Sequence, residues 1–110
     1  MINVNELTLG QIKELMSFAN SKQDNCPFEI GKNYLIRTAT FTISGKIKSK
    51  DLTFLVLSSA SWIADTGRFN ECLKDQNKFS EVEPFLNDCI VSKLSIVDAT
   101  EIKDLITVVK

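Results

Sequence analysis

The chain has 110 residues and a net charge of −1; 44% of its residues are hydrophobic and 25% are charged. This composition is typical of one small globular domain, and the balanced charge gives no strong signal for nucleic-acid binding. The sequence has no histidine, which excludes the Ser-His and Cys-His nucleophile systems and the commonest metal ligand, so we expect a non-enzymatic protein without a cofactor or metal.

The first predicted element is an amphipathic helix over residues 9–21. Thr8 and Gln11 have the spacing of a capping box, and an apolar stripe with helical spacing follows them. The stripe consists of Ile12, Leu15, Met16 and Ala19. It suits either a helix that binds a partner or a helix that covers the edge or end of a sheet.

The sequence also indicates the cellular compartment in which we expect the protein. It contains neither a positively charged leader with an apolar run nor an apolar stretch of about 18 residues. The three cysteines, Cys26, Cys72 and Cys89, are too scattered for a zinc site and fit the free thiols of a reducing compartment. We therefore expect no membrane span and a cytoplasmic protein, in the host cytoplasm if the chain is viral.

After a polar connection over residues 20–31, residues 33–48 are the clearest predicted strand region, because β-branched and aromatic side chains alternate there with polar ones. The alternation places Arg37 among the inward-facing residues. A buried guanidinium needs a carboxylate. Either a bulge near residues 38–40 reverses the alternation, or Arg37 has a partner, for which the candidates are Asp65, Glu83 and Asp98.

The next predicted strand, over residues 52–59, is apolar throughout its centre and follows a polar turn at residues 49–51. A continuous apolar run suits a strand that is covered on both faces. One face would belong to the core, and a helix or another subunit would cover the second. We therefore expect a homo-oligomer.

The last third of the chain predicts short elements. A short helix over residues 67–74, a loop over residues 75–80 and an edge segment over residues 81–85 precede two short strands over residues 89–91 and 95–99. The tail over residues 102–109 suits either a last strand or a helical turn.

Together these elements predict an α+β fold. It is a small antiparallel β-barrel or curled meander with an N-terminal helix and a short inserted helix. We assign residues 1–31 to the N-terminal helix and its connection and residues 32–110 to the β-rich core, all within one domain.

A candidate ligand site follows the only tryptophan. Gly67 and Arg68 stand in the first predicted turn of the short helix, where free N–H groups and the helix dipole favour an anion. Arg68 can bind phosphate or carboxylate in a bidentate manner, Trp62 can stack on a base, and Asp65 can accept from a ribose. With Thr66, these groups suit a small anionic, possibly nucleotide-like, ligand, although no P-loop is present.

Arg37 joins Trp62–Arg68 as a candidate ligand-binding residue. A purely structural interpretation of the same stretch is also open. It places Trp62 and Phe69 in the core, makes Asp65 or Thr66 a helix cap, and pairs Arg68 with Glu71 or Glu83.

The sequence also resembles a family of small uncharacterised proteins from phage and bacterial genomes. The resemblance covers residues 34–101, and its most specific block is Ala-Ser-Trp-Ile-Ala-Asp-Thr-Gly-Arg-Phe at residues 60–69. It departs at residues 92–94, where the family has a glycine-bearing turn. The resemblance implies a viral or mobile-element context but no reaction.

From these observations we expect a phage-type, non-enzymatic homo-oligomer that binds a small anionic ligand, for example by sequestering a signalling nucleotide. The alternative is a structural or adaptor protein of a phage particle or complex. An enzyme would have to work through carboxylates, lysine, or a cysteine such as Cys72 or Cys89.

Overall fold

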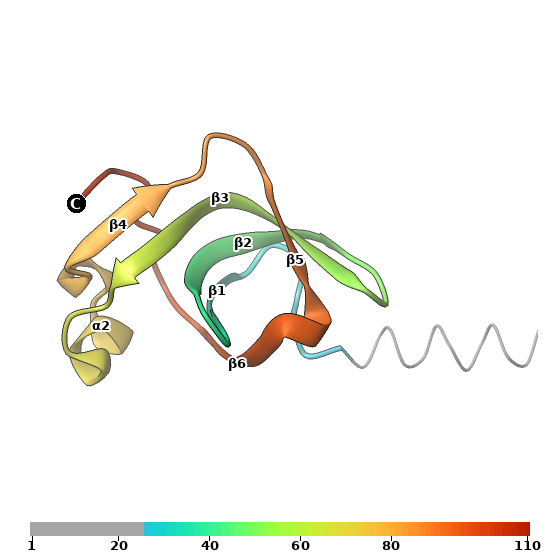
Figure 1. Ribbon diagram of the computed structural model, residues 1–110, viewed down its shortest axis with the longest axis horizontal. Coiled ribbons are helices and arrows are strands. Elements are labelled where there is room, and N and C mark those ends of the chain that lie inside the picture. Colours follow the sequence, from blue (N-terminus) through green and yellow to red (C-terminus); the bar gives the residue numbers. More distant parts are fainter. Residues whose placement is uncertain (1–25) are drawn as a thin grey trace, which may run out of the picture.

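The computed structural model describes residues 26–110, which form a curled, six-stranded antiparallel sheet (Figure 1). The strands are β1 (Asn33–Thr38), β2 (Thr42–Lys50), β3 (Phe54–Asp65), β4 (Glu81–Pro84), β5 (Cys89–Ser92) and β6 (Ile96–Glu101). The short helix α2 (Phe69–Lys74) and the 3-10 turn η1 (Gln76–Lys78) connect β3 to β4, and the 3-10 turn η2 (Lys93–Ser95) connects β5 to β6.

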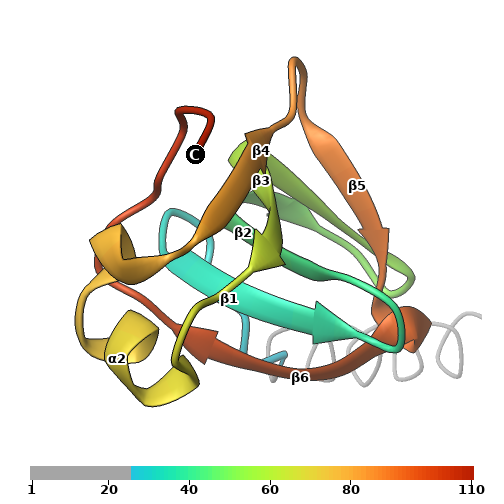
Figure 2. The same cartoon turned by 60° about the vertical axis from the view of Figure 1, so that its left-hand side comes forward.

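β3 organises the sheet because it pairs with three other strands. The strand order is β4-β3-β2-β1-β6, and β5 also pairs with β3. The first part of β3 pairs with β5, as in Leu55 opposite Val91, whereas its last part pairs with β4, as in Ile63 opposite Val82. Figure 2 shows the result: β4 and β5 diverge from β3 on one side, while β1 and β6 lie on the other.

The sheet bends where β2 and β3 cross the middle of the fold. Ser59 has a left-handed backbone with φ of 50°, and the β2–β3 register shifts between Ser44 and Lys46. Gly45 lies at that shift, and a Cβ atom there would stand 2.9 Å from Cβ of Leu57. The bend therefore needs a residue without a side chain at position 45.

Side chains alternate between two cores, one on each face of the sheet. In β1, Tyr34 and Ile36 belong to the inner core, whereas Leu35 between them belongs to the outer core. The inner core consists of Tyr34, Ile36, Ile43, Ile47, Leu55, Leu57, Ala60 and Val91. The outer core consists of Leu35, Ile63, Cys72, Phe79, Val82 and Ile102, so that α2, η1 and the C-terminal segment cover this face.

The C-terminal segment also closes one edge of the sheet. Lys110 and Val82 exchange two backbone hydrogen bonds, of 3.0 and 3.2 Å, so the end of the chain lies along the outer edge of β4. Upstream, the hydroxyl of Ser61 donates to the carbonyl oxygen of Ile106 at 2.7 Å. The tail is neither a regular strand nor a helical turn, the two forms that the sequence predicted.

The predicted α+β barrel is wrong: residues 26–110 form an open sheet with one short α-helix. The sheet does not close because β5 pairs only with β3, and η2 leads directly from β5 to β6 without pairing the two strands. The inserted helix is confirmed, although it begins at Phe69 instead of residue 67. The helix predicted over residues 9–21 lies outside the described residues.

The strand region predicted over residues 33–48 consists of two strands, β1 and β2. A tight turn separates β1 from β2: Thr38 N donates to the carbonyl oxygen of Phe41 at 2.7 Å, and the Thr38 hydroxyl accepts from Phe41 N at 2.9 Å. The turn contains no glycine, proline or asparagine, so its sequence resembles a strand. It reverses the alternation and leaves Arg37 exposed.

The close approach at the bend predicts that a side chain at position 45 lowers the stability of the protein. Gly45→Ala places a methyl group against Leu57, which is fully buried, so we expect a loss of about 1–3 kcal/mol in the free energy of unfolding. Urea denaturation measures this loss. The matched control is Lys46→Ala, the neighbouring exposed position, where the change should stay within about 0.5 kcal/mol. Equal effects of the two substitutions would contradict the close approach.

Candidate functional site

A hollow opens on the inner side of the curled sheet. We call it the aromatic groove; its volume is about 620 Å³. It is lined by Thr38, Thr40, Phe41, Ile43, Trp62, Glu83, Pro84, Phe85, Cys89, Ile90, Val91, Ser92 and Ser95. A volume of this size falls in the range of small-ligand and peptide sites.

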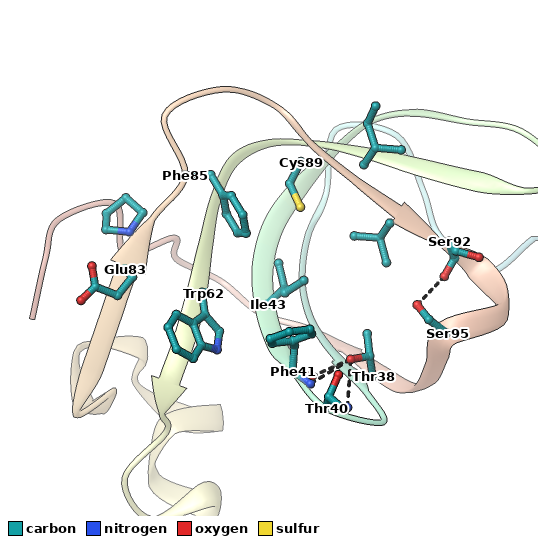
Figure 3. A pocket seen from close by; sticks show the side chains of 13 residues that line it. Thr38, Thr40, Phe41, Ile43, Trp62, Glu83, Phe85, Cys89, Ser92 and Ser95 are labelled. Carbon is teal, nitrogen blue, oxygen red and sulfur yellow. Dashed lines mark hydrogen bonds between the residues drawn. The ribbon is translucent and has the colours of Figure 1, made fainter.

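Three aromatic side chains border the groove and remain half-exposed. Phe41 is 53% exposed, Trp62 42% and Phe85 43%. Phe41 and Trp62 stand edge to face, with ring centroids 6.4 Å apart and an angle of 85° between the rings. Figure 3 shows Trp62 and Phe85 on one side of the groove, with Phe41 between Trp62 and the end that Ser92 and Ser95 form.

Each aromatic ring has a local structural reason for its position. Phe41 sits at the tip of the β1–β2 turn, where the backbone is held by Thr38. Trp62 lies in β3 just after the bend, so it faces the same side as the inner core. Phe85 directly follows β4, and its N–H donates to the carbonyl oxygen of Ala60 at 2.9 Å. The main chain that carries these rings is therefore held in the sheet or by hydrogen bonds, while the rings themselves remain half-exposed.

The groove contains little charge. Of the lining residues in the described part of the chain, Glu83 alone is charged, and it lies directly opposite Trp62 in the β3–β4 pair. The Ser95 hydroxyl already donates to the carbonyl oxygen of Ser92, at 2.7 Å. Burial raises the pKa of the Cys89 thiol and so keeps it neutral at physiological pH. The groove thus presents apolar surface with one carboxylate.

The structure separates the residues of the predicted ligand site. Trp62 lines the aromatic groove, whereas Asp65, Thr66, Gly67 and Arg68 do not line it. An Oδ1 oxygen of Asp65 accepts from Gly67 N at 2.8 Å, and the Thr66 hydroxyl donates to the carbonyl oxygen of Gly67 at 3.0 Å. These bonds form a local turn.

Gly67 has a structural reason to be glycine. Its φ is +68°, and a Cβ atom there would lie 2.9 Å from the carbonyl oxygen of Lys78. The N-cap of α2 is Arg68, with no side-chain capping bond, so the predicted cap at Asp65 or Thr66 is wrong. Arg68 is exposed and makes no ion pair among residues 26–110, and a pair with Glu71 or Glu83 is not formed.

Arg37 lies apart from Trp62. Its Nε donates to an Oδ1 oxygen of Asp98 at 2.7 Å, which confirms one of its three predicted partners. The guanidinium carbon also lies 4.7 Å from the centre of the Phe69 ring. Arg37, Phe69 and Asp98 contribute to a second hollow of about 240 Å³. The core position considered for Trp62 and Phe69 is wrong, because both are more than a third exposed.

The sequence did not reveal Phe41 and Phe85 as site residues. The sequence places Phe41 in a strand region, because the turn that Thr38 and Phe41 close contains no glycine, proline or asparagine. Phe85 follows Pro84, the one signal that marks the end of an edge strand, but nothing in its spacing indicates that it approaches Trp62. The groove depends on contacts between segments that are far apart in the chain.

No protein-family model, curated protein or solved structure matches this chain. The phage and bacterial family that it resembles therefore stays a prediction. Within residues 26–110, no helix has the length and apolar character to cross a membrane. In the same part of the chain, no three cysteine or carboxylate side chains lie close enough together to hold a metal ion.

The Arg37–Asp98 pair predicts a pH-dependent contribution to stability. The hydrogen bond from Arg37 holds the pKa of Asp98 below its ordinary value. A carboxylate whose folded pKa is lowered stabilises the fold fully above its unfolded pKa of about 3.9, and this stabilisation disappears as pH falls through the folded pKa. Asp98→Asn should therefore lower stability at pH 7, and the deficit should shrink below about pH 4.

Urea denaturation of the wild type and the variant at several pH values measures the deficit. Asp104→Asn is the control, because Asp104 is exposed and makes no ion pair among the described residues. A deficit for Asp98→Asn that stays constant from pH 7 to pH 3 would rule out the ion pair as its cause.

Proposed function

We propose that the protein is a non-enzymatic binding protein, an adaptor that takes an apolar segment of a partner into the aromatic groove. The observation that supports this proposal most is the open groove with three half-exposed aromatic side chains on a hydrogen-bonded main chain. Fixed aromatic surface offers large contact area at low entropic cost, and aromatic residues are enriched among the residues that dominate binding energies. The phage setting of this adaptor rests on the resemblance alone.

The charge of the groove favours a neutral or cationic partner segment. Glu83 is exposed beside Trp62, and no lining residue of the described chain offers a positive charge. An anionic group that entered the groove would meet the carboxylate without a compensating cation. Aliphatic or aromatic side chains with a lysine or arginine at one end fit this surface best.

Self-association belongs to the same proposal. In the β3–β5 pair, Phe54 and Ile90 are exposed, although the sequence expected the apolar run to be covered. Leu52 and Leu94, at the ends of the same ribbon, are exposed as well. Exposed apolar surface of this kind supports contact with a second copy of the chain.

The groove predicts specific binding of a neutral apolar dye. We expect Nile red to bind with quenching of Trp62, because that tryptophan is the only one in the chain and borders the groove. Phe41→Ser should weaken the dye's affinity by about tenfold, which corresponds to ~1.4 kcal/mol for the loss of one aromatic contact. Fluorescence titration measures both effects.

The matched control for this titration is Phe69→Ser. Phe69 is exposed to a similar extent, 39%, but it lies by the second hollow and not in the aromatic groove. Circular dichroism confirms that both variants fold. Equal weakening by the two substitutions, or no saturable binding to the folded wild type, would reject the groove as the site.

An anionic ligand at Arg68, outside the aromatic groove, remains a second proposal. It is supported by the exposed guanidinium of Arg68, which has no carboxylate partner among residues 26–110. It predicts that calorimetric titration with nucleoside mono-, di- and cyclic phosphates detects binding that Arg68→Ala removes and Phe41→Ser preserves. Absence of heat with every nucleotide and a well-folded sample would end this proposal.

A further inference from the structure

We propose that segment 9–21 of the same chain occupies the aromatic groove and that a partner must displace it. The inference rests on the proposed function, because it treats the groove as a binding site for an apolar segment. It names the first occupant of that site, which is part of the protein itself. Three observations support it: where the described chain begins, how far the preceding residues reach, and the chemistry of the segment.

The described chain begins beside one end of the groove. Phe28 packs edge to face on Tyr34, with centroids 5.1 Å apart, and its carbonyl oxygen accepts from Nζ of Lys50 at 2.6 Å. Phe28 and Ile96 border the same shallow hollow, and both pack against the inner core. Ser95, the neighbour of Ile96, lines the groove. The chain therefore enters the fold at the Ser92–Ser95 end.

The length of the preceding chain fits this entry point. Residues 22–25, which lie between this segment and the described chain, can span up to about 14 Å when extended, since each residue adds at most ~3.3–3.6 Å. A helix over residues 9–21 would be about 20 Å long at 1.5 Å per residue. The connection can thus bring the segment back from Phe28 to the groove without unfolding any described strand.

The segment has the chemistry that the groove favours. The sequence predicts that Ile12, Leu15, Met16 and Ala19 share one helix face, which is the pattern of a helix that lies in an apolar groove. Methionine adapts to irregular apolar surface and makes favourable contacts with aromatic rings such as that of Trp62. Lys13, at the border of the stripe, can approach the carboxylate of Glu83.

Occupation of the groove has a measurable consequence for outside ligands. If the segment fills the groove in nine of ten molecules, any other occupant binds about tenfold more weakly than it would to an empty groove. A partner would then need enough affinity for the groove to displace the segment.

Disulfide cross-linking tests the location directly. In the full-length Cys26→Ser protein, Met16→Cys places a thiol on the apolar stripe, and Cys89 supplies the groove thiol; Cys72 is fully buried. We expect oxidation with diamide to join position 16 to Cys89 within one chain. Ser17→Cys, on the opposite side of the predicted helix, should form at least tenfold less of this disulfide. Non-reducing electrophoresis and peptide mass spectrometry identify the product.

The other outcomes overturn the inference. Equal cross-linking of the two variants, or none in either, would show that the segment does not lie in the groove. A disulfide between two chains would overturn the assignment to the same chain. These results do not depend on whether any outside ligand binds.

Dye titration gives an independent readout. Leu15→Asp should move the emission of Trp62 to longer wavelength and tighten Nile red binding by about tenfold, because the groove is freed. Ser17→Asp should change neither. If Leu15→Asp and Ser17→Asp both leave the affinity for Nile red unchanged while Phe41→Ser lowers it, the segment's role is refuted and the proposed function is preserved. Positive cross-linking without any dye binding would instead refute the proposed function and preserve the inference.

Discussion

The bend that β2 and β3 share is the constraint on which the rest of the structure depends. Ser59 adopts a left-handed backbone, and the close approach of Gly45 to Leu57 lets the two strands fold over each other. Beyond the bend, β3 leaves β5 and pairs with β4 instead. A straight β3 would keep one partner strand along this edge, and the hollow between Trp62 and the β1–β2 turn would not exist.

α2, η1 and the C-terminal segment cover the outer face of this bent sheet. The Gln76 side chain is buried and fully used: its Nε2 donates to the carbonyl oxygen of Cys72 at 2.9 Å, and its Oε1 accepts from Asp104 N at 2.9 Å. One glutamine thus ties α2 to the C-terminal segment. With Lys110 paired to Val82, the outer face and one edge are occupied. The inner face has no such cover among residues 26–110, and that asymmetry explains why the groove is found there.

The sequence predicts local features of this fold better than their arrangement. The short helix and the Arg37–Asp98 pair followed from spacing and charge, because these are properties of neighbouring residues or of a few possible partners. The open sheet did not follow, since closure depends on whether β5 reaches β6, and no pattern within either strand records that. The predicted ligand residues do not all line one hollow for a similar reason: the turn at Asp65–Gly67 ends β3, so Arg68 belongs to the start of α2 and Trp62 to the strand.

The incomplete closure of the sheet links the fold to its proposed role. Pairing β5 with β6 would complete a barrel, and the inner core would then extend over Phe41 and Trp62. Burial of such rings is worth about 25 cal/mol per Å² of apolar surface, so the open form forgoes stability that a closed sheet would gain. Any segment that binds in the groove recovers part of this free energy. The exposed aromatic surface of the groove therefore lowers the stability of the free domain and also favours binding. Whether a segment of the same chain or of a partner occupies the groove decides which of the two is stabilised by burying this surface.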